Sequence, residues 1–141
     1  MMFHKTGTLA VAALAALSLS ACGGEQSVTE ACTIASTTVK AAESEITEAM
    51  SGATTGEFSK VVQGFETLGT TLSEAEGKIT NAEVKAALGD FRTSIQDFSK
   101  LFEGATDGDL TALADKTEEL QTISTKMGDS ATKLGELCPA G

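Results

Sequence analysis

The chain has 141 residues, which is enough for one domain. It carries 10 Lys and Arg against 20 Asp and Glu, so its formal net charge is −10. A surface of this charge repels nucleic acid and anionic lipid headgroups, and we expect no nucleic-acid partner.

The first 21 residues have the features of an export signal. Lys5 supplies a positive charge, and an apolar run follows over residues 9–17. The run has about the length of a signal-peptide core and is too short to span a bilayer, which takes roughly 20 residues. We therefore expect residues 1–21 to be a signal peptide that is removed, and we leave them out of the predicted fold.

The apolar run ends in Leu19-Ser20-Ala21-Cys22, where one aliphatic and two small residues precede a cysteine. This segment resembles the lipobox of bacterial lipoproteins. The resemblance covers residues 1–22 and implies that diacylglycerol is attached to the Cys22 thiol and that a peptidase cleaves before Cys22. It also implies a protein anchored by lipid to the extracytoplasmic face of the cell membrane, with two acyl chains for stable anchoring.

Two alternatives to lipidation at Cys22 remain open. The first is an ordinary secretory signal that is cut near Ser20 and leaves Cys22 as a plain thiol. The second is an uncleaved membrane helix. If Cys22 is acylated, residues 22–27 form a short tether, and the domain lies close to the membrane.

Four segments after this tether begin with the signature of a helix N-terminus, a hydroxyl residue followed three positions later by an acid. The pairs are Ser27 and Glu30, Thr54 and Glu57, Thr80 and Glu83, and Thr106 and Asp109. After each pair, apolar residues recur every three or four positions, which indicates amphipathic helices, and no segment alternates with the period of a strand. We predict helices over about residues 28–51, 55–79, 81–103 and 107–135.

Short connections between these helices make neighbouring helices antiparallel. The connections are predicted at residues 51–53, 77–80 and 104–105. The sequence therefore predicts an all-α domain over residues 28–138, an up-down-up-down antiparallel four-helix bundle. The apolar face of its last helix is predicted to include Leu110, Leu113, Thr117, Leu120, Ser124, Met127, Ala131, Leu134 and Cys138.

Cys32 and Cys138 continue the apolar faces of the first and last predicted helices. An even number of antiparallel helices brings both cysteines to the same end of the bundle, and disulfides persist outside the cytoplasm. We therefore expect a disulfide between them, with two free thiols or a bridge between two chains as the alternatives.

The predicted helix lengths conflict with this disulfide. They place Cys32 level with about residue 126, which leaves Cys138 about 18 Å further along a straight helix. A disulfide needs a Cα separation of roughly 4.4–6.8 Å. Either the last helix ends near Gly135 and the chain turns back, or the first and last helices are offset in register.

The expected mature chain offers no residue pattern for catalysis. His4 is the only histidine and lies in the expected signal peptide, so no imidazole base remains for a nucleophile or for a di-iron site. The Asp107-Gly108-Asp109 segment lacks the further ligands of a calcium loop. We expect no catalytic residue, no metal site and no cofactor. The carboxylates that could act as a catalytic acid–base pair all lie outside the apolar faces of the helices. They are Glu43, Glu45, Glu48, Glu118 and Glu119.

Two functions remain open for such a domain. The first is a non-enzymatic envelope protein that binds another protein or has a structural role. The second is a carrier or sensor that holds a small apolar ligand in a cavity among five phenylalanines, although phenylalanines at such positions more often simply fill a core. These candidate ligand-binding residues are Phe58, Phe65, Phe91, Phe98 and Phe102.

Overall fold

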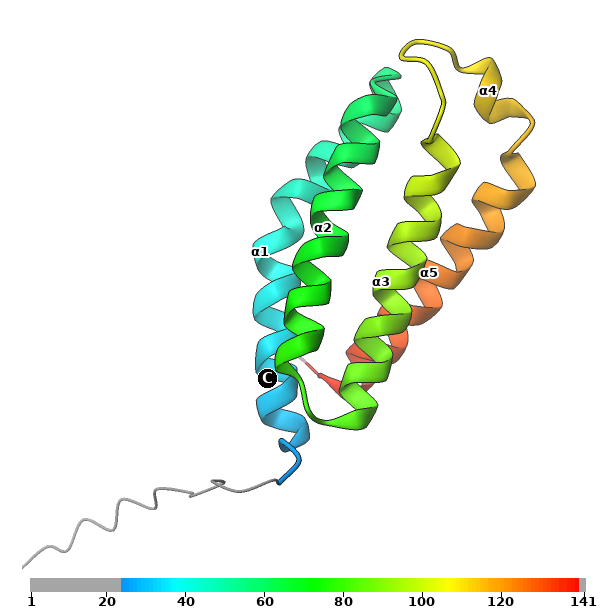
Figure 1. Cartoon of the computed structure of the whole chain (residues 1–141). Coiled ribbons are helices and arrows are strands. Elements are labelled where there is room, and N and C mark those ends of the chain that lie inside the picture. The colour runs from blue at the N-terminus through cyan, green and yellow to red at the C-terminus, as the bar shows by residue number, and fades with distance from the viewer. Residues whose placement is uncertain (1–23, 140–141) are drawn as a thin grey trace, which may run out of the picture.

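The computed structural model describes residues 24–139, and within them the protein is all-helical. The four long helices lie side by side, and a short fourth helix lies in the connection before the last one (Figure 1). The helices are α1 (Val28–Thr55), α2 (Phe58–Lys78), α3 (Ala82–Phe102), α4 (Thr111–Ala114) and α5 (Thr117–Leu137). None of these described helices is long and apolar enough to cross a membrane. The expected signal peptide (residues 1–21) and Cys22 lie outside the described residues.

The centre of the hydrophobic core is formed by α2 and α3. α1 packs on α2, α2 on α3 and α3 on α5, while α1 also meets α3. α1 buries alanines and one glycine, and α5 buries only Ile123 and Leu134, so these two helices are the lightly packed sides of the domain. The largest fully buried side chains are Phe58, Val61, Phe65, Leu68, Leu72, Ile79, Val84, Leu88 and Ile95.

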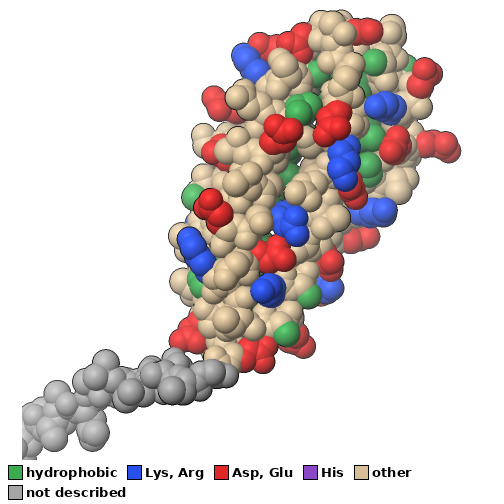
Figure 2. Space-filling view, in the orientation of Figure 1, with side chains coloured by type: hydrophobic (Ala, Val, Ile, Leu, Met, Phe, Trp, Pro, Cys, Tyr) green, Lys and Arg blue, Asp and Glu red, His purple; other side chains and the backbone are tan. Residues whose placement is uncertain are grey.

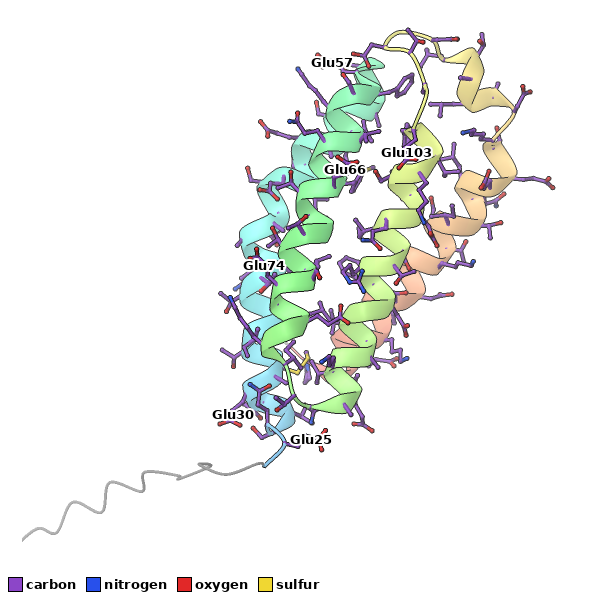
Figure 3. All side chains as sticks on the ribbon, in the orientation of Figure 1. Glu25, Glu30, Glu57, Glu66, Glu74 and Glu103 are labelled. Carbon is purple, nitrogen blue, oxygen red and sulfur yellow. A yellow bond between two sulfur atoms is a disulfide. The ribbon has the colours of Figure 1, made fainter. Side chains whose placement is uncertain are left out.

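Acidic side chains are spread over the surface and both ends of the domain. Figure 2 shows carboxylates on the visible face and around the end at which the chain enters the domain. Glu25 and Glu30 lie at this end, and Glu57 and Glu103 lie at the opposite end (Figure 3). We call the end that holds Glu25, Glu30 and the α2–α3 connection the base of the domain.

The first of the four predicted capping boxes is confirmed. Ser27 accepts a hydrogen bond from the Glu30 N–H, and the Glu30 carboxylate accepts one from the Ser27 N–H. α1 then continues through the connection predicted at residues 51–53 and ends at Thr55; the next residue, Gly56, caps it with a φ of 78°, in the left-handed region. Thr54 therefore lies inside α1, and the prediction that it begins the second helix is wrong.

The third predicted cap is displaced by one residue. Asn81, not Thr80, begins α3, and its side-chain oxygen accepts a hydrogen bond from the Val84 N–H at 3.1 Å. Asparagine is a slightly better N-cap than threonine, which favours the later start. The Thr80 hydroxyl and N–H bond instead to Gln26.

The prediction of a helix over residues 107–135 is wrong at its start. A loop and α4 precede α5, which begins at Thr117. Asp107 caps α2 from across the fold, because its carboxylate accepts hydrogen bonds from the Ser59 N–H at 2.8 Å and the Ser59 hydroxyl at 2.7 Å. This partner satisfies a helix end whose own N-cap residue, Glu57, makes no side-chain capping bond.

Replacing Asp107 by Ala should lower the melting temperature at neutral pH, because α2 loses this cap. Hydrogen bonds from the N–H and hydroxyl of Ser59 hold the pKa of the Asp107 carboxyl below its usual value of 3.8. A carboxyl with a lowered folded-state pKa stabilises the protein above its unfolded-state pKa, and this stabilisation is lost as the pH falls through the folded-state pKa. Thermal unfolding at neutral pH and well below pH 3.8 should show the wild-type advantage shrinking in acid.

The control for this prediction is Glu103→Ala in the same loop. The Glu103 carboxylate has no hydrogen-bond or ion-pair partner among the described residues, so its loss should leave the melting temperature nearly unchanged. Equal losses for the two variants, or a gap that does not close in acid, would contradict the proposed cap.

The buried face of α5 differs from the predicted one. Thr117, Ser124 and Ala131 were expected in the core and are exposed, whereas Ile123 is buried. The predicted face assumed a helix that runs on unbroken from Leu110. Because α5 starts only after a break, its phase is set by its own packing on α3.

The structure joins Cys32 in α1 to Cys138, the residue that follows α5, with their Cα atoms 5.2 Å apart. Thr55 lies about 34 Å from Cys32 and Thr117 about 32 Å from Cys138 along straight helices, at 1.5 Å per residue. At the end of the domain opposite the base, Thr55 of α1 and Thr117 of α5 therefore lie at nearly the same height. The chain does not turn back near Gly135, because α5 runs on to Leu137. The other alternative holds: the last helix begins about ten residues later than predicted, which shifts its register relative to α1 and brings Cys138 level with Cys32.

Candidate functional site

Four of the five candidate phenylalanines pack on one another in the core between α2 and α3. The ring centroids of Phe58 and Phe102 are 5.7 Å apart, those of Phe98 and Phe102 are 5.2 Å apart, and those of Phe65 and Phe98 are 5.1 Å apart in an edge-to-face arrangement. All five rings are buried. This packing favours a structural role for the four rings over a shared ligand cavity.

Phe91 lies apart from the other four rings and contributes to a different feature. It lines an apolar groove of about 200 Å³ between α1 and α5, which we call the α1–α5 groove. The groove exists because α5 packs on α3 while α1 packs on α2, and α1 and α5 are not among the helix pairs that pack closely. Its lining residues are Ala35, Ser36, Val39, Phe91, Ala131, Leu134, Gly135 and Cys138.

The walls of the α1–α5 groove are made of small side chains that do not fill the space between the helices. Gly135 illustrates this, because a Cβ built on it would meet no atom within 4 Å. Ala131 is exposed at the rim, whereas Leu134 and Phe91 are buried at the floor. The disulfide closes the lower end of the groove through Cys138.

Beyond the groove, half-buried apolar side chains extend along α1 and α5 toward the end of the domain opposite the base. Val39, Ile46 and Ala53 follow one another at seven-residue intervals on α1, so they share one stripe of that helix. Leu120 and Met127 are likewise half-buried on α5. α1 and α5 are antiparallel, and the Cys32–Cys138 disulfide joins them near the base. The two apolar stripes therefore border the same open edge of the domain.

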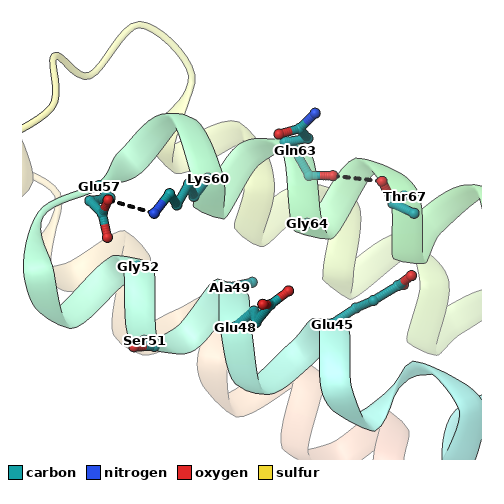
Figure 4. A pocket seen from close by; sticks show the side chains of 10 residues that line it. All are labelled: Glu45, Glu48, Ala49, Ser51, Gly52, Glu57, Lys60, Gln63, Gly64 and Thr67. Atoms are coloured by element: carbon teal, nitrogen blue, oxygen red, sulfur yellow. Dashed lines mark hydrogen bonds and ion pairs between the residues drawn. The ribbon is translucent and has the colours of Figure 1, made fainter.

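A second, more polar groove of about 520 Å³ lies between α1 and α2 (Figure 4). Three of its lining residues are carboxylates, and one of them, Glu57, pairs with Lys60 at 2.7 Å. This hydrogen bond is the main cause that lowers the pKa of Glu57 and raises the pKa of Lys60. The other two, Glu45 and Glu48, make no ion pair, and the described residues contain no cluster that could hold a metal. We take the α1–α5 groove as the candidate site because its lining is almost entirely apolar.

No protein-family model, curated protein or solved structure matches the chain. The geometry and chemistry of the α1–α5 groove must therefore indicate the function. The sequence placed Ala131, Leu134 and Cys138 on the apolar face of the last helix and did not indicate the open groove beside them. A signal was present: Ala131 and Gly135, which line the groove on α5, are too small to fill a helix–helix contact.

Proposed function

We propose that this chain is an envelope lipoprotein, anchored by lipid on Cys22, whose helical domain binds another protein and catalyses no reaction. In this proposal the four long helices are an up-down-up-down four-helix bundle that is open along the α1–α5 edge. The observation that carries the proposal is the α1–α5 groove, an apolar surface that the rest of the described chain leaves uncovered.

The size of the groove favours a protein partner over a small ligand. Sites for small molecules usually measure about 300–1,000 Å³, whereas this groove measures about 200 Å³. A space of this size suits one or two large apolar side chains, and such anchors in pockets supply most of the affinity of many protein interfaces. The partner we propose is a helix that inserts a large apolar residue between Val39 and Ala131.

Charge further defines this partner. The chain without residues 1–21 has 9 Lys and Arg against 20 Asp and Glu, a net charge of about −11. Basic residues beside the inserted apolar residue would complement the acidic surface and speed association. The proposed partner is therefore a basic, amphipathic helix.

Cross-linking in the native envelope tests this function. A photo-reactive amino acid at Ala131, on the groove rim, should give one defined adduct with a protein partner. The matched control is Thr132, which is exposed on α5 but absent from the groove lining. Filling the groove with Gly135→Leu should abolish the Ala131 adduct and leave the fold intact, since the open space at Gly135 accepts a side chain. Equal adducts at Ala131 and Thr132, or an adduct that survives Gly135→Leu, would contradict the proposal.

A further inference from the structure

The segment before α1 is bound to the α2–α3 connection through Gln26. The Gln26 N–H donates to the Thr80 hydroxyl at 2.9 Å, and its side-chain oxygen accepts from the Thr80 N–H at 2.9 Å. Its side-chain amide donates to the Lys78 carbonyl at 3.0 Å, and its own carbonyl accepts from the Asn81 side chain at 3.2 Å. Both the backbone and the side chain of this residue are therefore held by residues more than fifty positions away.

Neighbours on both sides of Gln26 extend this attachment. The Glu25 carboxylate accepts a hydrogen bond from the Ala82 N–H, and Ser27 begins α1 with its capping box. The chain is thus fixed to the base from Glu25 onward. Two residues, Gly23 and Gly24, separate Cys22 from Glu25, and the three Cα–Cα steps between these two positions span at most about 11 Å when fully extended.

The base itself is polar and acidic, which suits a surface that faces lipid headgroups without entering the bilayer. Figure 2 shows carboxylates around the point at which the chain enters the domain. Among the described residues of the base, Val28 is the one large apolar side chain that is exposed, with 39% of its surface accessible. The carboxylates near this end include Glu25, Glu30, Glu83 and Glu136, and the ammonium groups include Lys78, Lys85 and Lys133.

We propose that the Gln26 attachment turns the base into a rigid mount that holds the domain upright on the membrane, with the base toward a zwitterionic lipid surface. The proposal rests on the lipid anchor at Cys22 proposed above. A chain fixed from Glu25 onward cannot swing about a long tether, so the lipid on Cys22 and the base must stay together.

The mount also narrows the choice of partner for the α1–α5 groove. Val39 lies about 17 Å above Val28 along α1, at 1.5 Å per residue. With the reach of the tether added, the groove stays within about 30 Å of the lipid surface. The partner helix therefore belongs to a protein that is itself at the membrane and presents this helix close to the headgroups.

Neutron reflectometry tests the orientation of the domain on the membrane. The sample is the lipidated protein, purified from membranes and reconstituted on a phosphatidylcholine bilayer. An upright domain gives a layer at least as thick as the length of α1, about 42 Å. Gln26→Ala should give a thinner and more diffuse layer and faster hydrogen exchange at the Thr80 amide. Gln63→Ala, an exposed glutamine on α2, is the control and should match the wild type.

A second variant keeps the test valid if Gln26→Ala does not fold. Six Gly and Ser residues inserted between Gly24 and Glu25 lengthen the tether and leave every hydrogen bond of Gln26 in place, and this variant should also lose the upright layer. Wild-type layers for both variants, or a wild-type domain that lies flat, would overturn the rigid mount alone. Recovery of only unlipidated protein would overturn the anchor and with it the posture.

Discussion

Replacing Cys32 and Cys138 together by Ser should lower the free energy of unfolding by up to about 4.7 kcal/mol, the value expected when a loop of roughly 100 residues is no longer closed in the unfolded chain. Folded domains are commonly stable by about 5–15 kcal/mol, so this loss would remove a large part of the total. The expected fall in melting temperature is roughly 20 °C.

The structure also indicates where the protein should open first when the disulfide is removed. α5 buries only Ile123 and Leu134, and its ion pair to α3, between Lys133 and Asp90, is more than half exposed and contributes little. The hydroxyls of Ser130 and Ser94 add one hydrogen bond at 3.2 Å. α5 should therefore detach before α1, α2 and α3 separate.

Hydrogen exchange measured on the double Ser variant tests this order of opening. The amides of α5 should exchange faster than in the wild type, while the amides of α2 keep most of their protection. Reduction of the wild-type disulfide should reproduce the pattern. Uniform loss of protection across all helices, or unchanged stability after removal of both thiols, would contradict the assigned role of the disulfide.

Phe65→Ala should destabilise the domain by about 3–5 kcal/mol, as expected when a fully buried aromatic side chain leaves a cavity. Phe65 is 1% exposed and makes an edge-to-face contact with Phe98. Phe65→Leu keeps much of the apolar contact and loses the aromatic pair, which is worth about 0.5–1.5 kcal/mol, so it should cost clearly less. Denaturant unfolding of both variants measures the difference.

This series also separates the two functions that the sequence left open. If the phenylalanines surrounded an empty ligand cavity, shortening Phe65 would enlarge that cavity at little cost to the unliganded protein. A Phe65→Ala variant as stable as the wild type would therefore support the apolar carrier and weaken the case for a protein-binding domain with a filled core.

The sequence predicted the all-helical class and the pairing of Cys32 with Cys138 because both depend on patterns repeated along whole helices. It located the start of α1 at Ser27 because no competing cap lies nearby. The same four-residue signature misled elsewhere: Asn81 outcompetes Thr80, and Asp109 bonds to Thr111 at the start of α4 instead of capping a helix that begins at Thr106. A local signature cannot show which partner a capping group will find in the folded chain.

The α1–α5 groove was beyond prediction for a different reason. Apolar periodicity identified Ala131, Leu134 and Cys138 as inward-facing positions, but it does not fix the distance between two helices that are not neighbours in the chain. That distance depends on how α5 packs on α3 and on the break before Thr117. Small residues such as Gly135 then leave the space open.

The intact mass of the protein isolated from membranes under non-reducing conditions tests the proposed lipoprotein most directly. We predict a chain that begins at Cys22, carries diacylglycerol on that residue and has a mass two hydrogens below the fully reduced value, because Cys32 and Cys138 are linked. A chain that begins at another residue, or an unmodified Cys22 thiol in the membrane-bound protein, would contradict the lipid anchor on which the proposed function depends.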